Sequence, residues 1–333
     1  MIYGASGYMG KLFARELVRS AVRPVLAGRG PAVERLAQDL GCRSVIFGIE
    51  NRADIAERLK GVSILVNLAA PFADTQNPLV SACVASGTHY IDIAGEVDEM
   101  RRVHAFDQAA RGADVMLMPG AGFGVVPTDI AANIAKQRLP DATMLRIAYA
   151  TEGGASRGTL RTVLRDIDRP GIRIVEGSSV VAAPGETRME FAVGARSFSA
   201  VYNPWRADLF TAAISTGIPN ISTYSAFPGF IVSMMSGRLL WLRDLMLHQL
   251  LRFFPEGPSA RQLLKGATFV EAVADNGTAT ARVAFKGPEA YLFTALCLKE
   301  IVVATIAGHW TAGFQTPAYY GKDLLDRVGV EWS

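Results

Sequence analysis

Cysteine and histidine are scarce in this sequence of 333 residues. The three cysteines form no C-x-x-C pair, and the four histidines are scattered without metal-ligand spacing. A disulfide scaffold and a zinc cage are therefore excluded, and no metal site is expected. The low cysteine content fits a protein of the reducing cytoplasm.

An excess of one charge sign is also missing. The chain has 34 basic and 31 acidic residues, for a formal net charge of +3, which argues against nucleic-acid binding. Half of the residues are hydrophobic and 20% are charged, so the chain is not disordered. A chain of this length is expected to form two domains.

The N-terminus lacks the basic and apolar stretches of a signal peptide. Only Met1, Ile2 and Tyr3 precede the first glycine, which is short for a strand, so we expect the natural chain to begin a few residues upstream. The longest uncharged run, residues 209–237, contains two prolines and many serines and threonines. We interpret it as strand and loop rather than as a membrane span.

Residues 239–254 have the pattern of a strongly apolar helix. Arg243, Asp244, His248 and Arg252 fall on one stripe, and the apolar face is wider than a surface helix needs. This pattern favours a core or dimer helix. Contact with a membrane or another lipid surface is the alternative.

Strand and helix patterns alternate through the first third of the chain. Short apolar strands are expected at residues 1–3, 25–28, 44–47, 63–68, 90–93 and 114–118. Helical patterns follow the glycine motif and occupy residues 34–40, 53–59, 78–86 and 97–111. This alternation predicts an α/β fold, a Rossmann doubly wound parallel sheet.

The motif G-x-x-G-x-x-G lies between the first strand and the first helix. Gly4 permits the tight turn, Gly7 lets backbone approach a pyrophosphate, and Gly10 lets the helix pack close to the strand. The free N–H groups of the helix N-terminus attract the anion. The alternative is an ordinary glycine-rich turn, but the strand before and the helix after it favour dinucleotide binding.

A carboxylate is missing at the end of the second strand. NAD sites usually have Asp or Glu there to bind the ribose 2′-hydroxyl. Here the strand ends in Gly28 and Arg29, and a guanidinium can contact a 2′-phosphate and stack on adenine. The sequence therefore favours NADP(H), with a solvated arginine as the alternative.

Three further stretches follow strands of the expected sheet. They are N-L-A-A-P-F at residues 67–72, G-T-H-Y-I-D-I-A-G-E at 87–96 and P-G-A-G-F-G-V-V-P-T-D at 119–129. The first and third lie at the carboxyl edge, where dinucleotides bind. Thr128 or Asp129 is expected as a helix N-cap.

Together these stretches, with K-G-P-E-A-Y at residues 286–291 and G-F-Q-T-P-A at 313–318, resemble the saccharopine dehydrogenase-like oxidoreductases. Within that family the set is most similar to the trans-acting enoyl reductase branch. The resemblance implies a Rossmann domain at 1–128, a second α+β substrate and dimerisation domain with a mixed sheet at 129–310, and a segment at 311–333 that returns to the first domain. Gly124 stands where the family often has Asp, which puts any activity that depends on that Asp in doubt.

The second half contains patterns that suit a mixed sheet. Strands are expected at residues 144–150, 188–193 and 197–202, and a hairpin with strands at 267–274 and 279–285 around Asp-Asn-Gly-Thr. Helices are expected at 158–167, 288–307 and 316–328.

Hydride transfer requires the protein to position the nicotinamide and to supply a proton. We predict the cofactor-binding residues to be Gly4, Ser6, Gly7, Tyr8, Met9, Gly10, Arg29, Ala69, Ala70, Pro71, Phe72, Gly122 and Phe123. The candidate proton donors are Tyr90, Asp92 and Glu96, although Asp92 could be structural and Glu96 could cap a helix. His89 is an alternative donor or a surface residue.

A second glycine-rich loop, residues 151–159, is expected to bind substrate through Gly153, Ser156 and Thr159. A flexible loop is the alternative. Residues 216–220 are expected to line the same cleft, and few charged residues occur near them. An apolar or neutral small molecule is therefore expected, while Arg157 and Arg161 keep an anionic group open. The sequence predicts an NADP(H)-dependent, cytoplasmic, homodimeric oxidoreductase that reduces a C=N or C=C bond. The alternatives are an enoyl reductase acting on a carrier-bound or lipidic chain, with lipid or carrier-protein contact, and a non-catalytic NADP(H)-binding regulator.

Overall fold

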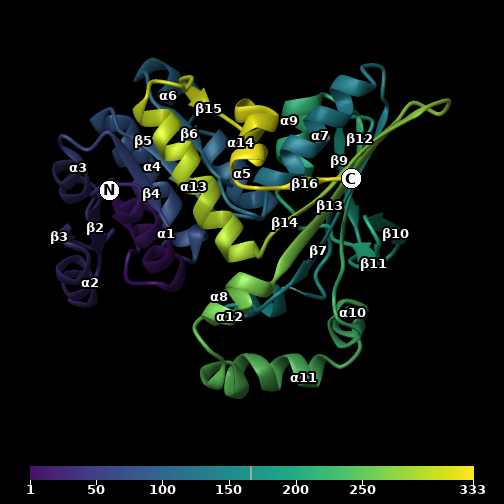
Figure 1. The fold of residues 1–333 in the computed structure, drawn as a ribbon, viewed down its shortest axis with the longest axis horizontal. Helices are drawn as coiled ribbons and strands as arrows, with labels where there is room; N and C mark the ends of the chain where they lie inside the picture. Colours follow the sequence, from purple (N-terminus) through teal and green to yellow (C-terminus); the bar gives the residue numbers. More distant parts are fainter. Residues whose placement is uncertain (166) are drawn as a thin grey trace. The chain divides into compact units, whose positions relative to one another are not determined.

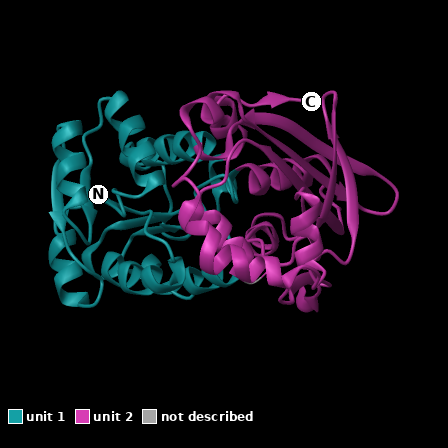
Figure 2. Ribbon diagram, turned by 90° about the horizontal axis from the view of Figure 1, so that it is seen from below, with its two compact units in different colours: residues 1–126, 292–320 teal, residues 127–291, 321–333 magenta. Residues whose placement is uncertain are grey.

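The computed structural model describes residues 1–165 and 167–333. The chain divides into two compact units (Figure 2). Unit 1 contains residues 1–126 and 292–320, and unit 2 contains residues 127–291 and 321–333. Among the described residues, no helix combines the length and the hydropathy that crossing a bilayer requires.

Unit 1 is built on a seven-stranded parallel sheet in the order β15-β6-β5-β4-β1-β2-β3 (Figure 1). The strands are β1 Ile2–Tyr3, β2 Val25–Gly28, β3 Arg43–Ile46, β4 Ile64–Asn67, β5 His89–Asp92, β6 Met116–Met118 and β15 Gly313–Phe314. The predicted doubly wound parallel sheet is confirmed, and β15 extends it with a strand from the far end of the chain.

The helices of unit 1 follow the strands as the apolar spacing predicts. They are α1 Tyr8–Arg19, α2 Ala32–Leu40, α3 Arg52–Leu59, α4 Phe72–Ser86, α5 Val97–His104, α6 Asp107–Gly112 and most of α13 Ala290–Ile306, with the 3-10 turn η3 Pro317–Tyr320. Two expectations were inexact. α4 begins at Phe72 and contains Pro78 inside it, where the missing N–H removes one hydrogen bond of the helix. The helix expected at 97–111 is two helices, α5 and α6.

Unit 2 contains a mixed sheet in the order β10-β11-β12-β7-β13-β14-β16, with β8 and β9 off this path. Its strands are β7 Met144–Glu152, β8 Gly171–Val175, β9 Ser178–Ala182, β10 Arg188–Val193, β11 Arg196–Tyr202, β12 Asn220–Ser225, β13 Ala267–Asp275, β14 Thr280–Pro288 and β16 Glu331–Trp332. β7 and β12 pair in parallel, and β13 pairs antiparallel with β7 and β14. The predicted second domain with a mixed sheet is confirmed.

Six separate helices and one longer helical stretch complete the described part of unit 2. The helices are α7 Val126–Arg138, α8 Arg157–Arg165, α9 Asp208–Thr216, α10 Gly229–Met235, α12 Ala260–Lys265 and α14 Gly321–Arg327. A further helical stretch consists of α11 Leu240–Leu245, the π turn η1 Met246–Leu250 and the 3-10 turn η2 Leu251–Phe253. Residue 166, inside the helix expected at 158–167, lies outside the described residues.

The interpretation of residues 209–237 as strand and loop was wrong in part. Only β12 is a strand, and the helices α9 and α10 flank it. Gly217 ends α9 in a left-handed conformation with φ +66°, and Pro228 precedes α10. The run therefore divides at its glycine and proline into elements too short for the helical spacing to be evident.

For residues 239–254, where a core or dimer helix was expected, the core part of the expectation was wrong. Within this stretch only Met246 and Leu251 are buried, and α11 has no buried residue. The segment is helical, but it lies at the surface of unit 2.

Candidate functional site: the carboxyl edge of the parallel sheet

The glycine loop after β1 fits tightly against neighbouring backbone. Gly4 has φ +83°, and a Cβ atom there would lie 2.7 Å from the Ala69 nitrogen. A Cβ atom on Gly10 would lie 2.4 Å from the Gly4 carbonyl oxygen. Side chains at either position would displace the backbone, so these two glycines are required by the close approach of β1, α1 and the 68–69 loop.

The N-terminus of α1 presents a cradle for an anion. Gly7, the exposed N-cap residue, has no side chain to satisfy the first N–H groups of the helix, and the first turn contains no acidic residue. The N-terminal end of a helix carries partial positive charge, and its first turn lacks intrahelical acceptors. Ser6, Tyr8 and Met9 are half-buried around this turn, whereas Gly10 is buried. The residues present therefore fit a pyrophosphate.

A buried hydrogen-bond network fixes the loop after β4. Asn67 donates to Thr75 Oγ1 and to the Tyr90 hydroxyl, both at 3.0 Å, and its Oδ1 accepts from the Ala69 N–H at 3.0 Å. Thr75 donates to the Ala69 carbonyl at 2.8 Å. These bonds hold the loop so that Ala70 and Pro71 are exposed, with Ala69 and Phe72 half-buried beside them.

Asp92 joins this network to the loop after β6. Its carboxylate accepts from the Tyr90 hydroxyl at 2.8 Å and from Gln76 Nε2 at 2.9 Å. It also accepts from the Ala94 N–H at 2.9 Å and the Gly120 N–H at 3.1 Å. Burial raises the pKa of Asp92, and burial together with the Asp92 charge raises the pKa of Tyr90 well above its usual value.

The predicted donors Tyr90 and Asp92 are thus both fully buried and bonded to each other. A group that gives a proton to a substrate must face that substrate. The Tyr90 hydroxyl and the Asp92 carboxylate face other groups of the protein instead. Their geometry supports a positioning role, because Asp92 connects two of the loops that the sequence assigned to the cofactor.

Glu96 caps α5, as one of the open alternatives anticipated. Its side chain accepts from the Glu99 N–H, and Glu99 reaches back to the N–H groups of Gly95 (3.1 Å) and Glu96 (3.3 Å). Burial, with the charges of Glu96 and Asp92, raises the pKa of Glu99 to about 8. Sequence reasoning missed Glu99, although an acidic residue three places after an N-cap is the signal for a capping box.

The remaining predicted residues of unit 1 differ in accessibility. Gly122 and Phe123 are buried, and Phe123 donates its N–H to Thr294 Oγ1 at 3.0 Å. Position 124 lies next to Gly95, since a Cβ atom there would be 3.7 Å from the Gly95 Cα. His89 begins β5, at the opposite edge of the sheet. It accepts from the Met116 N–H and its ring packs at a tilt against that of Trp310, and burial lowers its pKa.

Arg29 is exposed directly after β2. Its positive charge acts on the buried hydroxyl of Tyr3 and opposes the rise in the Tyr3 pKa that burial causes. The negative charge of Glu50, beyond β3, raises the pKa of the same hydroxyl. No hydrogen bond or ion pair among the described residues occupies the Arg29 guanidinium, so it remains available to a ligand.

In unit 2, three hydroxyl groups meet at the start of α8. The Tyr291 hydroxyl accepts from the Ser156 N–H at 2.7 Å and lies 2.7 Å from Thr159 Oγ1. Ser156 Oγ lies 3.0 Å from Thr159 Oγ1. The structure therefore brings two predicted substrate residues together with Tyr291, which the sequence marked only through its K-G-P-E-A-Y stretch.

Gly153, the third predicted substrate residue, lies beside Glu289. A Cβ atom there would be 2.8 Å from the side chain of Glu289, a buried residue that also accepts from the Tyr291 N–H at 2.8 Å. The surface hollow of about 390 Å³ in unit 2 is separate from the hydroxyl cluster. It is lined by Glu190, Phe191, Ala192, Ser197, Glu271 and Arg282.

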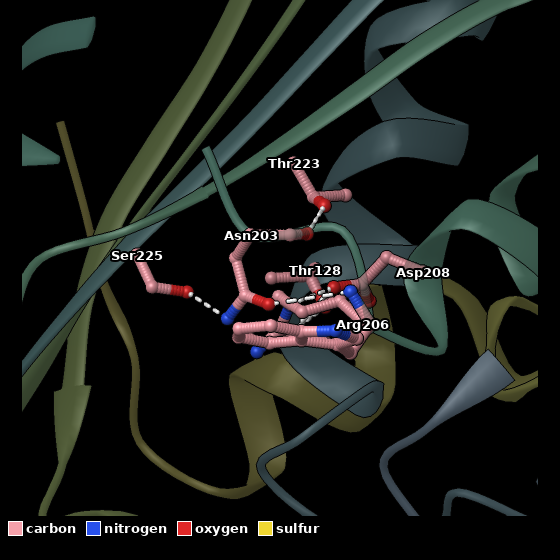
Figure 3. Close-up of polar contacts among 7 residues, drawn as sticks. Thr128, Asn203, Arg206, Asp208, Thr223 and Ser225 are labelled. Carbon is pink, nitrogen blue, oxygen red and sulfur yellow. Dashed lines mark hydrogen bonds and ion pairs between the residues drawn. The ribbon is translucent and has the colours of Figure 1, made fainter. Parts of the chain in front are cut away.

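A buried polar cluster in unit 2 was also missed by sequence reasoning (Figure 3). Arg206 pairs with Asp208, and Thr128 donates to the same carboxylate. Asp208 holds the pKa of Arg206 above its usual value, so the guanidinium stays charged although it is buried. Nearby, Asn203 bonds to Ser225 and its carbonyl accepts from Thr223.

The prediction that Thr128 or Asp129 caps α7 was wrong. The helix begins at Val126, so Thr128 and Asp129 lie inside its first turn. Thr128 bonds to Asp208, and Asp129 accepts from Ser215 at 2.7 Å, so both side chains connect α7 to α9. These contacts join elements of unit 2 to one another, which indicates a structural role.

Comparison with known proteins supports the assignment of unit 1. Residues 1–118 match the family model described as the saccharopine dehydrogenase NADP binding domain. The saccharopine dehydrogenase-like oxidoreductase of Mus musculus is 26% identical over 160 residues, which cover 42% of this chain and 37% of that protein. A provisionally named trans-acting enoyl reductase of Mycobacterium tuberculosis is 29% identical over 181 residues, covering 49% and 43%. The match thus spans well under half the length of these curated relatives.

Solved structures show the same fold across the whole chain. The apo saccharopine dehydrogenase (L-Glu forming) of Saccharomyces cerevisiae has a TM-score of 0.68 at 10% identity, covering 100% of this chain and 98% of that one. The homospermidine synthase of Legionella pneumophila, solved with NAD, has a TM-score of 0.67 at 9% identity, covering 100% and 90%. The chain therefore has the saccharopine dehydrogenase fold, and its first 118 residues are similar to the dinucleotide-binding domain of that family.

Proposed function

We propose that this chain is an NADP(H)-dependent oxidoreductase that transfers hydride to a C=N or C=C bond of a neutral or apolar organic substrate. The observation that carries the proposal is the glycine loop of a domain that matches an NADP-binding family. In that loop, Gly4 and Gly10 leave no room for side chains, and the N-terminus of α1 is uncapped and free of acidic residues.

The residues around this loop form the proposed cofactor site. Backbone of the α1 N-terminus binds the pyrophosphate, while the 69–72 loop and the 120–123 loop flank the nicotinamide half. The bound dinucleotide supplies the hydride. The buried Asn67, Tyr90 and Asp92 hold the two loops in place, and we propose them as positioning residues rather than as proton donors.

Selection of NADP(H) over NAD(H) is proposed from Arg29. Its exposed guanidinium follows β2, at the position where NAD-specific sites usually have a carboxylate. A planar guanidinium can form two hydrogen bonds to a phosphate. Glu50 argues for the other cofactor. Its negative charge also affects the pKa of the Tyr3 hydroxyl, and a carboxylate there would favour NAD(H) by accepting from the free ribose hydroxyl.

The hydroxyl cluster of unit 2 is the proposed substrate-binding group. Ser156, Thr159 and Tyr291 offer hydroxyls that can donate to a carbonyl or imine atom, and Tyr291 can pass a proton to Thr159 along a 2.7 Å contact. The three groups of this cluster are uncharged hydroxyls, which fits a neutral substrate, and the buried carboxylate of Glu289 beside them is bonded to the Tyr291 N–H. Arg157 donates to the Phe254 carbonyl and is therefore already engaged.

A second candidate is reduction of an enoyl group on a carrier-bound or lipidic chain. The similarity to the mycobacterial protein named as an enoyl reductase favours it. A third is a non-catalytic NADP(H)-binding regulator, because Gly124 replaces the Asp that the family often has. Both candidates use the same dinucleotide site.

Consumption of reduced nicotinamide, measured with panels of cyclic imines, enoyl thioesters and α,β-unsaturated ketones, tests the proposal. We expect turnover with one class and NADPH as donor. NADPH binding without turnover on any of the three classes would favour the regulator, and absence of NADPH binding would contradict every form of the proposal.

A further inference from the structure

Exposed apolar side chains are concentrated in residues 229–265 of unit 2, which we call the amphipathic segment. Of the fifteen large apolar residues that are exposed in the described chain, seven lie in this segment, including every exposed aromatic. They are Phe230, Leu239, Trp241, Leu250, Phe253, Phe254 and Leu264. Trp241, Phe253 and Leu264 are 67%, 75% and 82% exposed. Such concentration on one segment marks an interaction surface.

The opposite side of the segment is firmly packed. Ile231, Met234, Met235 and Met246 are buried in a cluster with α8 and β11 side chains. Arg243 pairs with Asp168 at 2.7 Å, and Arg157 donates to the Phe254 carbonyl. Figure 1 shows α10, α11 and α12 together at one end of unit 2, beyond the sheet. The exposed side is therefore presented by an anchored element and does not result from a failure to fold.

The amphipathic segment also carries the whole net charge of the chain. It contains five basic and two acidic residues, a formal charge of +3, and the rest of the chain has 29 residues of each sign. Arg238, Arg252, Arg261 and Lys265 are exposed. Asp244, one of the two acidic residues, pairs with Arg243. Exposed aromatics interspersed with cations are typical of helices that lie in the interface of an anionic membrane.

We propose that residues 229–265 bind reversibly to an anionic lipid surface, with Trp241 and Phe253 entering the interface and the exposed cations contacting phosphate headgroups. A second copy of the chain is a poorer occupant, because a two-fold contact would bring two identical positive patches together. The proposal holds whether or not the proposed reduction occurs, since it depends on none of the residues of the dinucleotide site.

Co-sedimentation of the full chain with vesicles tests the proposal. We expect binding to vesicles of phosphatidylcholine mixed with phosphatidylglycerol and little binding to phosphatidylcholine alone, with added salt weakening the interaction. Phe253→Ser should lower the partition coefficient about tenfold. Its matched control is Val181→Ser, which removes a side chain that is 81% exposed in β9 of the same unit and should change nothing.

Charge and insertion are tested separately. Arg252→Glu should lower the partition coefficient at least about fivefold, while Arg188→Glu, at an exposed position on β10, should leave it unchanged. Lipids brominated in the acyl chain should quench the fluorescence of the protein, and Trp241→Phe should remove that quenching.

Absence of binding to anionic vesicles at low salt would overturn the proposal, and so would equal effects of the test and control variants. A concentration-dependent dimer that Phe253→Ser dissociates, without vesicle binding, would assign the surface to a second copy instead.

Discussion

Glu99 shows how one half-buried residue links the site to pH. Its pKa is about 8 in the native chain, well above the ordinary value, because burial and two neighbouring carboxylates disfavour the charge. At a pH between 4.5, its ordinary pKa, and about 8, Glu99 keeps its proton in the native state and loses it in the unfolded chain. Stability from this residue is therefore full at low pH and is lost as pH rises through about 8, at up to about 1.4 kcal/mol per pH unit.

Glu99→Gln keeps the acceptor of the capping box and removes the titration. We expect its unfolding free energy, measured in urea, to fall less than that of the wild type between about pH 5 and about pH 9. Glu57→Gln, on the exposed face of α3, is the control and should follow the wild type. Parallel curves for Glu99→Gln and wild type would show that Glu99 is ionised throughout.

The sequence predicted the position of a site residue correctly where that position depends only on neighbouring residues. The spacing of Gly4, Gly7 and Gly10 depends on one turn and one helix, so sequence alone located the loop. Asp92 and Gly120 are 28 residues apart, and Ser156 and Tyr291 are 135 apart. Their hydrogen bonds exist only after the sheet orders, so no local pattern distinguishes a buried positioning residue from a proton donor.

At the scale of elements, the buried pair of Arg206 and Asp208 joins the start of α9 to α7. Asp208→Asn removes the charge that compensates a buried guanidinium, and we expect a loss of about 3–5 kcal/mol in the free energy of unfolding. Chemical denaturation measures it. Asp244→Asn, whose side chain is 55% exposed, should cost less than about 1 kcal/mol. Equal losses for the two variants would contradict the role given to the cluster.

Elements were predicted best where a simple period or turn motif applies. The hairpin of β13 and β14 was located by Asp-Asn-Gly-Thr, and Gly277 has φ +88° there. The stretch at 239–254 misled, because its hydrophobicity suits a core while its outer side chains face solvent. Composition gives the apolar content of a helix but does not show whether another element covers it.

At the scale of the molecule, the proposed function gives the two units separable tasks. We propose cofactor binding in unit 1 and substrate binding at the hydroxyl cluster of unit 2. Tyr291→Phe should therefore leave the Kd for NADPH unchanged and lower kcat about a hundredfold, as expected for a lost proton donor. Stopped-flow and steady-state kinetics on the substrate found by the panel measure both. A rise in KM alone, with kcat unchanged, would limit Tyr291 to substrate binding.

The central claim is that the carboxyl edge of the unit 1 sheet binds NADP(H). Calorimetric titration of the full chain with NADPH and with NADH tests it most directly, together with Arg29→Glu and the control Arg43→Glu at the opposite end of the strands. We predict one NADPH site, weaker NADH binding, and loss of the preference only in Arg29→Glu. Binding of neither nucleotide, or tighter binding of NADH by the wild type, would contradict the account.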